Sequence, residues 1–337
     1  HLEAYFAAPA MGAVLHTINI RLFTEDLVYI INHAGDKVVL VDPDLVPILE
    51  PLASRFKSVN HFIVMTDDQN FTTTLPSAHN YEDLISGASN TYSPVDSDEG
   101  APAGLCYTSA TTGRPKGVIY SHRGIVLHSM MEAQADTIGF RERDVVLPVV
   151  PMFHANCWGV PYSSAMVGAN LVLTGVRPDP EVICRLFESE KVTLSLGVPT
   201  IWVGILDYLE RSGNTHDFTS LREIASGGSA VPISLIEAYR EKLGVNMVQA
   251  YGMTEATPVI SYNRRTSKLD GITEGEKLQL AGTQGAMVPG LEMRLVDDEG
   301  NDLPWDGEQR GELLFKGPWI ADSYYNDPRS VDTFIDG

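Results

Sequence analysis

One segment of the sequence combines hydroxyl, glycine and lysine side chains in a pattern suited to holding phosphate groups. Residues 107–117 read Tyr-Thr-Ser-Ala-Thr-Thr-Gly-Arg-Pro-Lys-Gly, and the apolar run over 103–107 predicts a buried strand. Backbone N–H groups and hydroxyls in such a loop can donate to phosphate oxygens, and Lys116 adds a positive charge. Ser121 followed by Ile125 predicts an N-capped helix, so we expect the loop to lie between a strand and a helix. The pattern indicates a nucleotide-phosphate site.

The spacing differs from the common phosphate loop, G-x-x-x-x-G-K-S/T. Gly113 precedes Lys116 by three positions, and Gly117 follows the lysine. In isolation, a Ser/Thr/Gly cluster of this kind is more often a flexible linker than a binding site. Further segments of the sequence favour the binding site.

Three other segments carry residue types that could serve a nucleotide and an acid. Residues 249–255, Gln-Ala-Tyr-Gly-Met-Thr-Glu, offer a flat aromatic ring, a glycine and a carboxylate suited to Mg²⁺. Residues 226–232, Ser-Gly-Gly-Ser-Ala-Val-Pro, lie between a predicted strand and a helix that begins at Pro232. Residues 151–159, Pro-Met-Phe-His-Ala-Asn-Cys-Trp-Gly, place Trp158 among small and apolar residues. Taken singly, these could be a strand end, an ordinary turn and a core tryptophan.

Together, the four segments resemble the signature motifs of the adenylate-forming superfamily, which contains acyl-CoA ligases, luciferases and peptide-synthetase adenylation domains. They occur in the order found in that superfamily. The loop departs from the pattern Y/F-T-S-G-S/T-T-G-x-P-K-G at one position, where Ala110 replaces a glycine and reduces the backbone's freedom. Residues 1–6, 15–21 and 146–154 resemble medium- and long-chain fatty acyl-CoA ligases in particular.

The resemblance implies roles for individual residues, with ATP, Mg²⁺ and coenzyme A as cofactors. The implied catalytic residues are Lys116, His154, Thr254 and Glu255, and the implied metal ligands are Thr111 and Glu255. The implied nucleotide-binding residues are Thr108, Ser109, Ala110, Thr111, Thr112, Gly113, Lys116, Gly227, Gly228, Ser229, Gln249, Tyr251, Gly252, Met253 and Thr254. The implied substrate-binding residues are His154, Trp158, Val198, Gly228 and Pro258.

The segment around His154 bears on the substrate. Relatives that activate amino acids carry Phe-Asp here, because a buried ammonium needs a carboxylate partner, whereas this chain has Phe153-His154. No carboxylate lies between Val145 and Val176, which disfavours an amino acid. The resemblance makes Trp158 the gate of an acyl tunnel. It predicts an ATP-dependent fatty acyl-CoA ligase. The alternatives are a ligase for a short sulfur-containing or aryl acid, and a fragment that binds nucleotide and acyl chain without turnover.

The charge and composition of the chain favour small molecules as its binding partners. The 24 basic and 44 acidic residues give a net charge of −20, which excludes general affinity for nucleic acid or anionic membrane. The three cysteines (Cys106, Cys157 and Cys184) have apolar neighbours and no C-x-x-C spacing, which predicts buried thiols. No run of about 18 apolar residues and no signal-peptide pattern is present, so we expect a cytoplasmic protein. The resemblance adds the expectation of a homodimer.

Short apolar runs alternate with helical patterns along most of the chain. We expect strands over 37–42, 62–65, 171–173 and 193–196, and helices over 181–191, 200–211 and 233–243. This alternation predicts an α/β fold of layered β-sheets flanked by helices, as in the N-terminal domain of adenylate-forming enzymes. From Gly290 the pattern changes to one typical of antiparallel strands, which predicts a small distorted β-barrel.

The expected organisation is an α/β part over 1–285 and a barrel-like part over 286–337. Residues 87–104 resemble a linker, and residues 266–279 a mobile surface segment. We expect both ends to be incomplete. By the resemblance, the chain stops before a ribose-binding aspartate and lacks the small C-terminal domain that carries a catalytic lysine.

Overall fold

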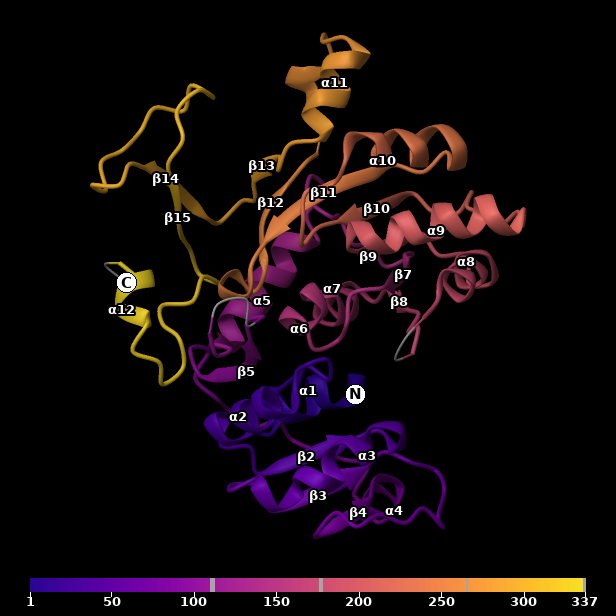
Figure 1. Ribbon diagram of the computed structural model, residues 1–337, viewed down its shortest axis with the longest axis vertical. Helices are drawn as coiled ribbons and strands as arrows, with labels where there is room; N and C mark the ends of the chain where they lie inside the picture. Colours follow the sequence, from indigo (N-terminus) through magenta and orange to yellow (C-terminus); the bar gives the residue numbers. More distant parts are fainter. Residues whose placement is uncertain (110–112, 176–177, 265, 336–337) are drawn as a thin grey trace. The chain divides into compact units, whose positions relative to one another are not determined.

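The computed structural model describes residues 1–109, 113–175, 178–264 and 266–335. The chain divides into two compact units (Figure 1). The first unit comprises His1–Ile119 and Ser323–Gly337, and the second unit comprises Tyr120–Asp322. The predicted boundary between residues 285 and 286 stays a prediction.

The first unit is built from short strands and helices, most of them from the N-terminal third of the chain. Its elements are α1 (Leu2–Ala10), β1 (Leu15–His16), α2 (Thr24–Ala34), β2 (Val38–Val41), η1 (Pro43–Leu45), α3 (Val46–Leu49), η2 (Glu50–Arg55), β3 (His61–Val64), β4 (Ala78–Asn80), α4 (Tyr81–Ser86), β5 (Pro102–Tyr107) and α12 (Ser330–Thr333). Strand β6 (Gly117–Ser121) continues from it into the second unit. Residues 87–101 hold no helix or strand, whereas residues 102–104 of the predicted linker belong to β5.

Two three-stranded sheets organise the first unit. One has the order β2-β3-β4 with parallel pairing, and the other has the order β1-β5-β6. Side chains on β2 alternate, with Val39 and Val41 buried and Val38 and Leu40 exposed. The prediction of a strand here is confirmed, but only one face of it is buried.

The second unit holds the larger part of the chain. Its elements are α5 (His122–Glu132), β7 (Val145–Pro148), α6 (Ala155–Trp158), α7 (Val160–Val167), β8 (Asn170–Leu171), α8 (Pro180–Ser189), β9 (Leu194–Gly197), α9 (Pro199–Ser212), β10 (Glu223–Ser226), α10 (Ile233–Ala238), η3 (Tyr239–Leu243), β11 (Met247–Gly252), η4 (Thr254–Ala256), β12 (Val259–Tyr262), η5 (Ser267–Leu269), α11 (Glu274–Ala281), β13 (Ala286–Met287), β14 (Glu292–Val296) and β15 (Glu312–Lys316).

A seven-stranded sheet with the order β13-β12-β11-β10-β9-β7-β8 forms the centre of the second unit. Its central strands pair in parallel, while β12 and β13 pair antiparallel. Strands β9 and β10 are buried on both faces, as expected for parallel strands covered by helices. The indole of Trp202 on α9 donates a hydrogen bond to Ser226 Oγ at the end of β10 (3.0 Å). This contact holds the strand end from which residues 226–232 depart.

The predicted fold class of layered sheets flanked by helices is confirmed, with two local differences. Strands β14 and β15 pair antiparallel as predicted, but the described residues form a two-stranded sheet there and close no barrel. Residues 266–279 contain the start of helix α11, because Thr273 and Glu276 form a capping box at its first turn. Among the described residues, no helix combines the length and apolar character needed to cross a bilayer.

Candidate functional site

The phosphate loop joins two strands of the first unit. The Thr108 N–H donates to the Lys116 carbonyl (2.9 Å), and the Lys116 N–H donates to Thr108 Oγ1 (3.2 Å), so the ends of the loop close as a hairpin between β5 and β6. Gly113 has φ of +89°, which favours glycine. The predicted helix capped by Ser121 is confirmed as α5, but β6 over residues 117–121, which the sequence did not predict, separates it from the loop. Phosphate would therefore meet hairpin N–H groups and hydroxyls rather than a helix terminus.

Ser109 is exposed at the start of the loop, whereas Ala110, Thr111 and Thr112 lie outside the described residues. The roles implied for these three residues stay predictions.

Lys116 is held by a residue from near the end of the chain. Its ammonium donates to the Tyr324 hydroxyl (2.8 Å) and lies 4.1 Å from the centroid of that ring. Tyr324 forms an antiparallel bridge with Val118, and the Tyr325 N–H donates to the Gly117 carbonyl (2.8 Å). Sequence reasoning missed Tyr324, because the two partners are 208 positions apart. This contact uses one of the three ammonium N–H donors and orients the lysine.

The glycine turn of the second unit lies against Trp158. A Cβ added at Gly227 would lie 2.8 Å from the Ala250 carbonyl oxygen and 3.3 Å from the Trp158 ring. Gly228 has φ of +77°, and a Cβ there would lie 3.2 Å from Val198. Protein atoms alone therefore require glycine at 227. Val198, Trp158 and the two glycines form one patch, and Ser229 beside it is exposed.

Segment α6, which presents Trp158, has an unusual backbone. Ala155, Asn156, Cys157 and Trp158 all have positive φ, between 45° and 56°, and Gly159 follows at 78°. A left-handed turn of non-glycine residues costs about 1–2 kcal/mol per residue, and such strain occurs often at functional sites. Trp158 is only 7% exposed, so the structure places it in the core and against the glycine turn at once. His154 is half-buried directly before the turn.

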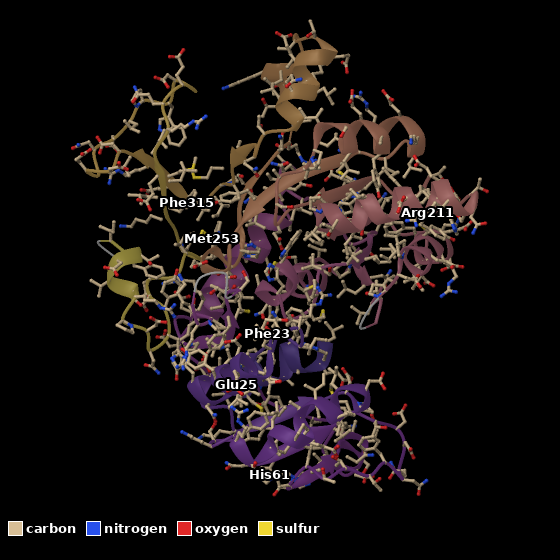
Figure 2. The ribbon with its side chains drawn as sticks, viewed as in Figure 1. Phe23, Glu25, His61, Arg211, Met253 and Phe315 are labelled. Carbon is tan, nitrogen blue, oxygen red and sulfur yellow. The ribbon has the colours of Figure 1, made fainter. Side chains whose placement is uncertain are left out.

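Strand β11 brings together several predicted nucleotide-binding residues. The fully buried Gln249 accepts a hydrogen bond from the Val231 N–H through Oε1 (2.8 Å), while its Nε2 has no partner among the described residues. The half-buried Tyr251 lies 6.3 Å from the ring of Phe315, which Figure 2 labels together with Met253. Burial, and then the charge of Glu255, raise the pKa of Tyr251, so the ring stays a neutral phenol.

The turn after β11 depends on Gly252. A Cβ there would lie 2.2 Å from the Pro258 carbonyl oxygen, which accepts a hydrogen bond from the Met253 N–H (3.0 Å). The Thr254 carbonyl accepts from the Tyr120 hydroxyl (2.8 Å), and Thr254 itself is largely buried. This packing fixes the position of η4, the short helix that contains Glu255.

Glu255 is half-buried, and its backbone carbonyl accepts from the Ala321 N–H (2.7 Å). No three His, Cys, Asp or Glu side chains of the described residues gather into a metal cluster. Mg²⁺ in nucleotide sites is commonly bound by one or two carboxylates plus substrate phosphates, so the single Glu255 fits that requirement.

A buried polar cluster under Gly159 was not anticipated. Ser163 on α7 donates a short hydrogen bond to Glu132 Oε2, which lies 3.7 Å from His128 Nδ1 on the same helix, α5. His128 Nε2 accepts from the Val259 N–H (3.2 Å), which leaves the ring proton on Nδ1. A Cβ at Gly159 would lie 2.9 Å from His128 Nδ1. The only signal in the sequence was the i, i+4 spacing of His128 and Glu132.

Both ionisable members of this cluster are neutral at pH 7. Burial raises the pKa of Glu132 to about 8 and lowers the pKa of His128 to about 3. The contact is close enough to be an ion pair, but complete burial opposes charge on either group. Glu132 Oε2 lies 3.1 Å from the position of a Cβ on Gly159, so this carboxyl reaches the segment over 151–159, which contains no carboxylate of its own.

We expect Glu132→Gln to change how stability depends on pH. Because the pKa of Glu132 is raised above its ordinary value of 4.5, the unfolded state loses its proton first, and the wild type loses stability between about pH 4.5 and pH 8. The slope approaches about 1.4 kcal/mol per pH unit within that window. Glutamine does not titrate, so the two curves diverge as pH rises. Thermal melts from pH 4 to pH 9 measure this, with the exposed Glu299→Gln as control. Parallel curves for wild type and Glu132→Gln would contradict the assignment.

A model of the AMP-binding enzyme family matches residues 1–325. The chain belongs to this family.

Two curated relatives of this AMP-binding enzyme and one solved structure agree with the assignment. The chain is 46% identical over 332 residues to a long-chain-fatty-acid–CoA ligase of Thermus thermophilus, covering 98% of this chain and 59% of the relative. It is 43% identical over 326 residues to a 3-methylmercaptopropionyl-CoA ligase of Ruegeria lacuscaerulensis, covering 96% of this chain and 60% of the relative. The crystal structure of an anthranilate CoA ligase with anthranoyl-AMP superposes with a TM-score of 0.84 at 24% identity, covering 99% and 60%, and shows the fold. The chain spans about three fifths of the length of these relatives.

Proposed function

We propose that this AMP-binding enzyme is an ATP-dependent ligase that joins a fatty acid to coenzyme A. In the first step a carboxylate oxygen of the acid attacks the α-phosphorus of ATP, and the bond to pyrophosphate breaks. In the second step the thiol of coenzyme A takes the acyl group and AMP leaves. The substrate carboxylate is itself the nucleophile, so the protein has to bring anions together and stabilise the departing charge.

The residues present fit this task. In the first unit, the hairpin offers N–H groups, the hydroxyls of Thr108 and Ser109, and the oriented ammonium of Lys116 for phosphate oxygens. In the second unit, the buried Gln249 has an Nε2 donor without a described partner, and Tyr251 offers an aromatic face for a base. Mg²⁺ would be held by Glu255, together with Thr111 by the resemblance, and would offset charge on the phosphates.

The observation that carries the substrate class is the patch around Trp158. The indole of Trp158 covers Gly227 and Gly228, and burial raises the pKa of the Glu132 carboxyl beneath the neighbouring Gly159 to about 8, which favours its neutral form at pH 7. Such a surface favours an uncharged acyl chain, for which each buried CH₂ contributes about 0.8 kcal/mol. A relative named for fatty acids at 46% identity supports the same substrate.

We expect Trp158→Ala to flatten the preference for acyl chain length. The wild type should release pyrophosphate faster as a series of straight-chain acids lengthens up to an optimum, because the patch buries more methylene groups. Removing the indole leaves a cavity beside Gly227 and weakens that discrimination. Phe218→Leu, at an equally buried aromatic residue in a different core cluster of the second unit, serves as a control for general disturbance. If Trp158→Ala keeps the wild-type profile, the residue acts only in the core.

Two other results of the experiment with the acid series would favour a different function. A response that is flat with chain length but high for 3-methylmercaptopropionate or an aryl acid would favour a ligase for that acid, which the 43% identical Ruegeria lacuscaerulensis relative supports. Binding of ATP without acid-dependent release of pyrophosphate would favour a nucleotide- and acyl-binding module without turnover.

We further propose a cytoplasmic location and a homodimer. The three cysteines are buried free thiols, which suits a reducing compartment. The homodimer rests on the resemblance to fatty acyl-CoA ligases, and light scattering in solution tests it.

A further inference from the structure

An open groove in the first unit is lined by two arginines from distant parts of the sequence. Arg114 comes from the phosphate loop, and Arg329 precedes α12. Tyr29, His33, Asp327 and Asn326 complete most of the lining. The volume of about 460 Å³ lies in the range of small-molecule sites.

Arg329 is fixed in place by an almost completely buried carboxylate. Its Nε donates to Asp327 Oδ1 (2.9 Å) and its Nη2 to Asp327 Oδ2 (2.5 Å), while the carboxylate is only 6% exposed. Its Nη1 donates to the Arg114 carbonyl (3.1 Å). Arg329 keeps the pKa of Asp327 low, at about 2, so that carboxylate stays ionised. The guanidinium is therefore held rigidly at the base of the phosphate loop.

The geometry of Arg329 leaves part of its donor capacity unused. A guanidinium has five N–H groups, and the hydrogen bonds to Asp327 and Arg114 use three of them. No described residue accepts from the other two. Nη1 lies 3.8 Å from the position of a Cβ on Gly113, so the arginine faces a loop residue that carries no side chain. These N–H groups lie beside the groove, and the arginine side chain is 39% exposed.

Arg114 adds a second cation without a counter-charge. Its guanidinium lies 4.9 Å from the centroid of Tyr29, and no described carboxylate forms an ion pair with it. His33 on α2 also lines the groove, and its Nδ1 lies 2.7 Å from the Tyr107 hydroxyl. Since Asp327 offsets only one of the two arginines, the groove carries a net positive charge within a chain of net charge −20.

We propose that Arg114 and Arg329 form an anion site in this groove for a ligand that carries phosphate groups, and that this site extends the phosphate loop. A planar guanidinium with a fixed fork binds phosphate oxygens in a bidentate manner, which an ammonium cannot do. Asp327 supplies the rigidity, because it holds Arg329 before the ligand arrives. The site needs only a phosphate anion. Its assignment to the triphosphate of ATP or to the released pyrophosphate rests on the proposed function.

Titration calorimetry of the chain with inorganic pyrophosphate tests the site without any catalysis. We expect Arg329→Ala to weaken binding on the order of tenfold to a hundredfold, as for a lost charge-assisted hydrogen bond. Arg329→Lys keeps the charge but not the fork, so its loss is smaller. Arg55→Ala, which removes a cation paired with Glu25 in the same unit, serves as the control and changes binding by less than about twofold.

The variant Asp327→Asn distinguishes direct binding of the ligand by Arg329 from structural support of the loop by Arg329. Asparagine keeps one side-chain oxygen that can accept from Arg329, so much of the support remains while a negative charge is lost from the groove. If Arg329 contacts the ligand, pyrophosphate therefore binds at least as tightly as in the wild type. If Arg329 only supports the loop through Arg114, then Asp327→Asn and Arg329→Ala weaken binding alike, and the site is overturned. Circular dichroism confirms that each variant is folded.

Coenzyme A and dephospho-coenzyme A distinguish the sources of the phosphate. If Arg329→Ala removes a preference for coenzyme A over its dephospho form, the site takes the 3′-phosphate of that molecule. If it changes pyrophosphate and ATP binding instead, the site serves the nucleotide. If it changes neither, the proposal is wrong. A wild-type chain that binds pyrophosphate but activates no acid would reject the proposed function and keep the anion site.

Discussion

Lys116→Ala is expected to lower the rate of acyl-adenylate formation about a hundredfold or more, because it removes a positively charged donor aimed at developing phosphate charge. The variant should lose only about 1 kcal/mol of unfolding free energy, the usual worth of one hydrogen bond, since the loop hairpin closes through Thr108 and the backbone. Acid-dependent pyrophosphate release and denaturant unfolding measure the two effects separately.

Tyr324→Phe is the matched control for that experiment. It removes the 2.8 Å hydrogen bond from Lys116 but keeps the ammonium and the ring beneath it. We expect a stability loss close to that of Lys116→Ala with an activity loss of less than about tenfold. Equal activity losses in the two variants would mean that the lysine acts by holding Tyr324 in place, and the phosphate role would then be wrong.

Glu255→Gln is expected to lower the rate of acyl-adenylate formation by a similar factor, because it weakens the binding of Mg²⁺. The amide keeps the shape of the side chain but loses the charge that a hard cation needs, so adenylate formation should fall by about two orders of magnitude. The concentration of Mg²⁺ needed for half of the maximal rate should rise. The turn itself should persist, because it is tied by the backbone bond from Ala321 and by the Tyr120 hydroxyl on the Thr254 carbonyl.

Magnesium titration distinguishes a metal ligand from a structural carboxylate. The exposed Glu308→Gln removes the same charge elsewhere in the second unit and should leave the titration unchanged. If Glu255→Gln loses activity without any change in the Mg²⁺ requirement, Glu255 does not hold the metal.

Local sequence patterns predicted those elements whose signal lies within a few residues. Helix α9 shows apolar residues three or four apart, and β9 is a short apolar run, so both were predicted within about two residues. Ser121 caps α5 as expected, with its Oγ accepting from the Gly124 N–H (3.0 Å). The strand over residues 117–121 was not predicted, because five residues are too few for periodicity to identify a strand.

Local sequence patterns could not predict contacts between residues that lie far apart in the chain. Nothing in the sequence near Lys116 points to Tyr324, and nothing near Arg114 points to Arg329. The left-handed turn before Gly159 also lacks a local signal, because Ala155, Asn156 and Cys157 ordinarily avoid positive φ. Its neighbours Ser163 and Glu132 meet only because α5 and α7 lie together in the second unit.

By itself, the sequence determined the family, the layered α/β fold and the segments that carry the chemistry, because these depend on residue types and short spacings. Only the tertiary structure decided that the phosphate loop is a strand hairpin, that Gly227 and Gly252 make room for protein atoms, and that the carboxyl beside the Trp158 segment is neutral. Those properties arise from steric exclusion and burial, which depend on groups far apart in the chain.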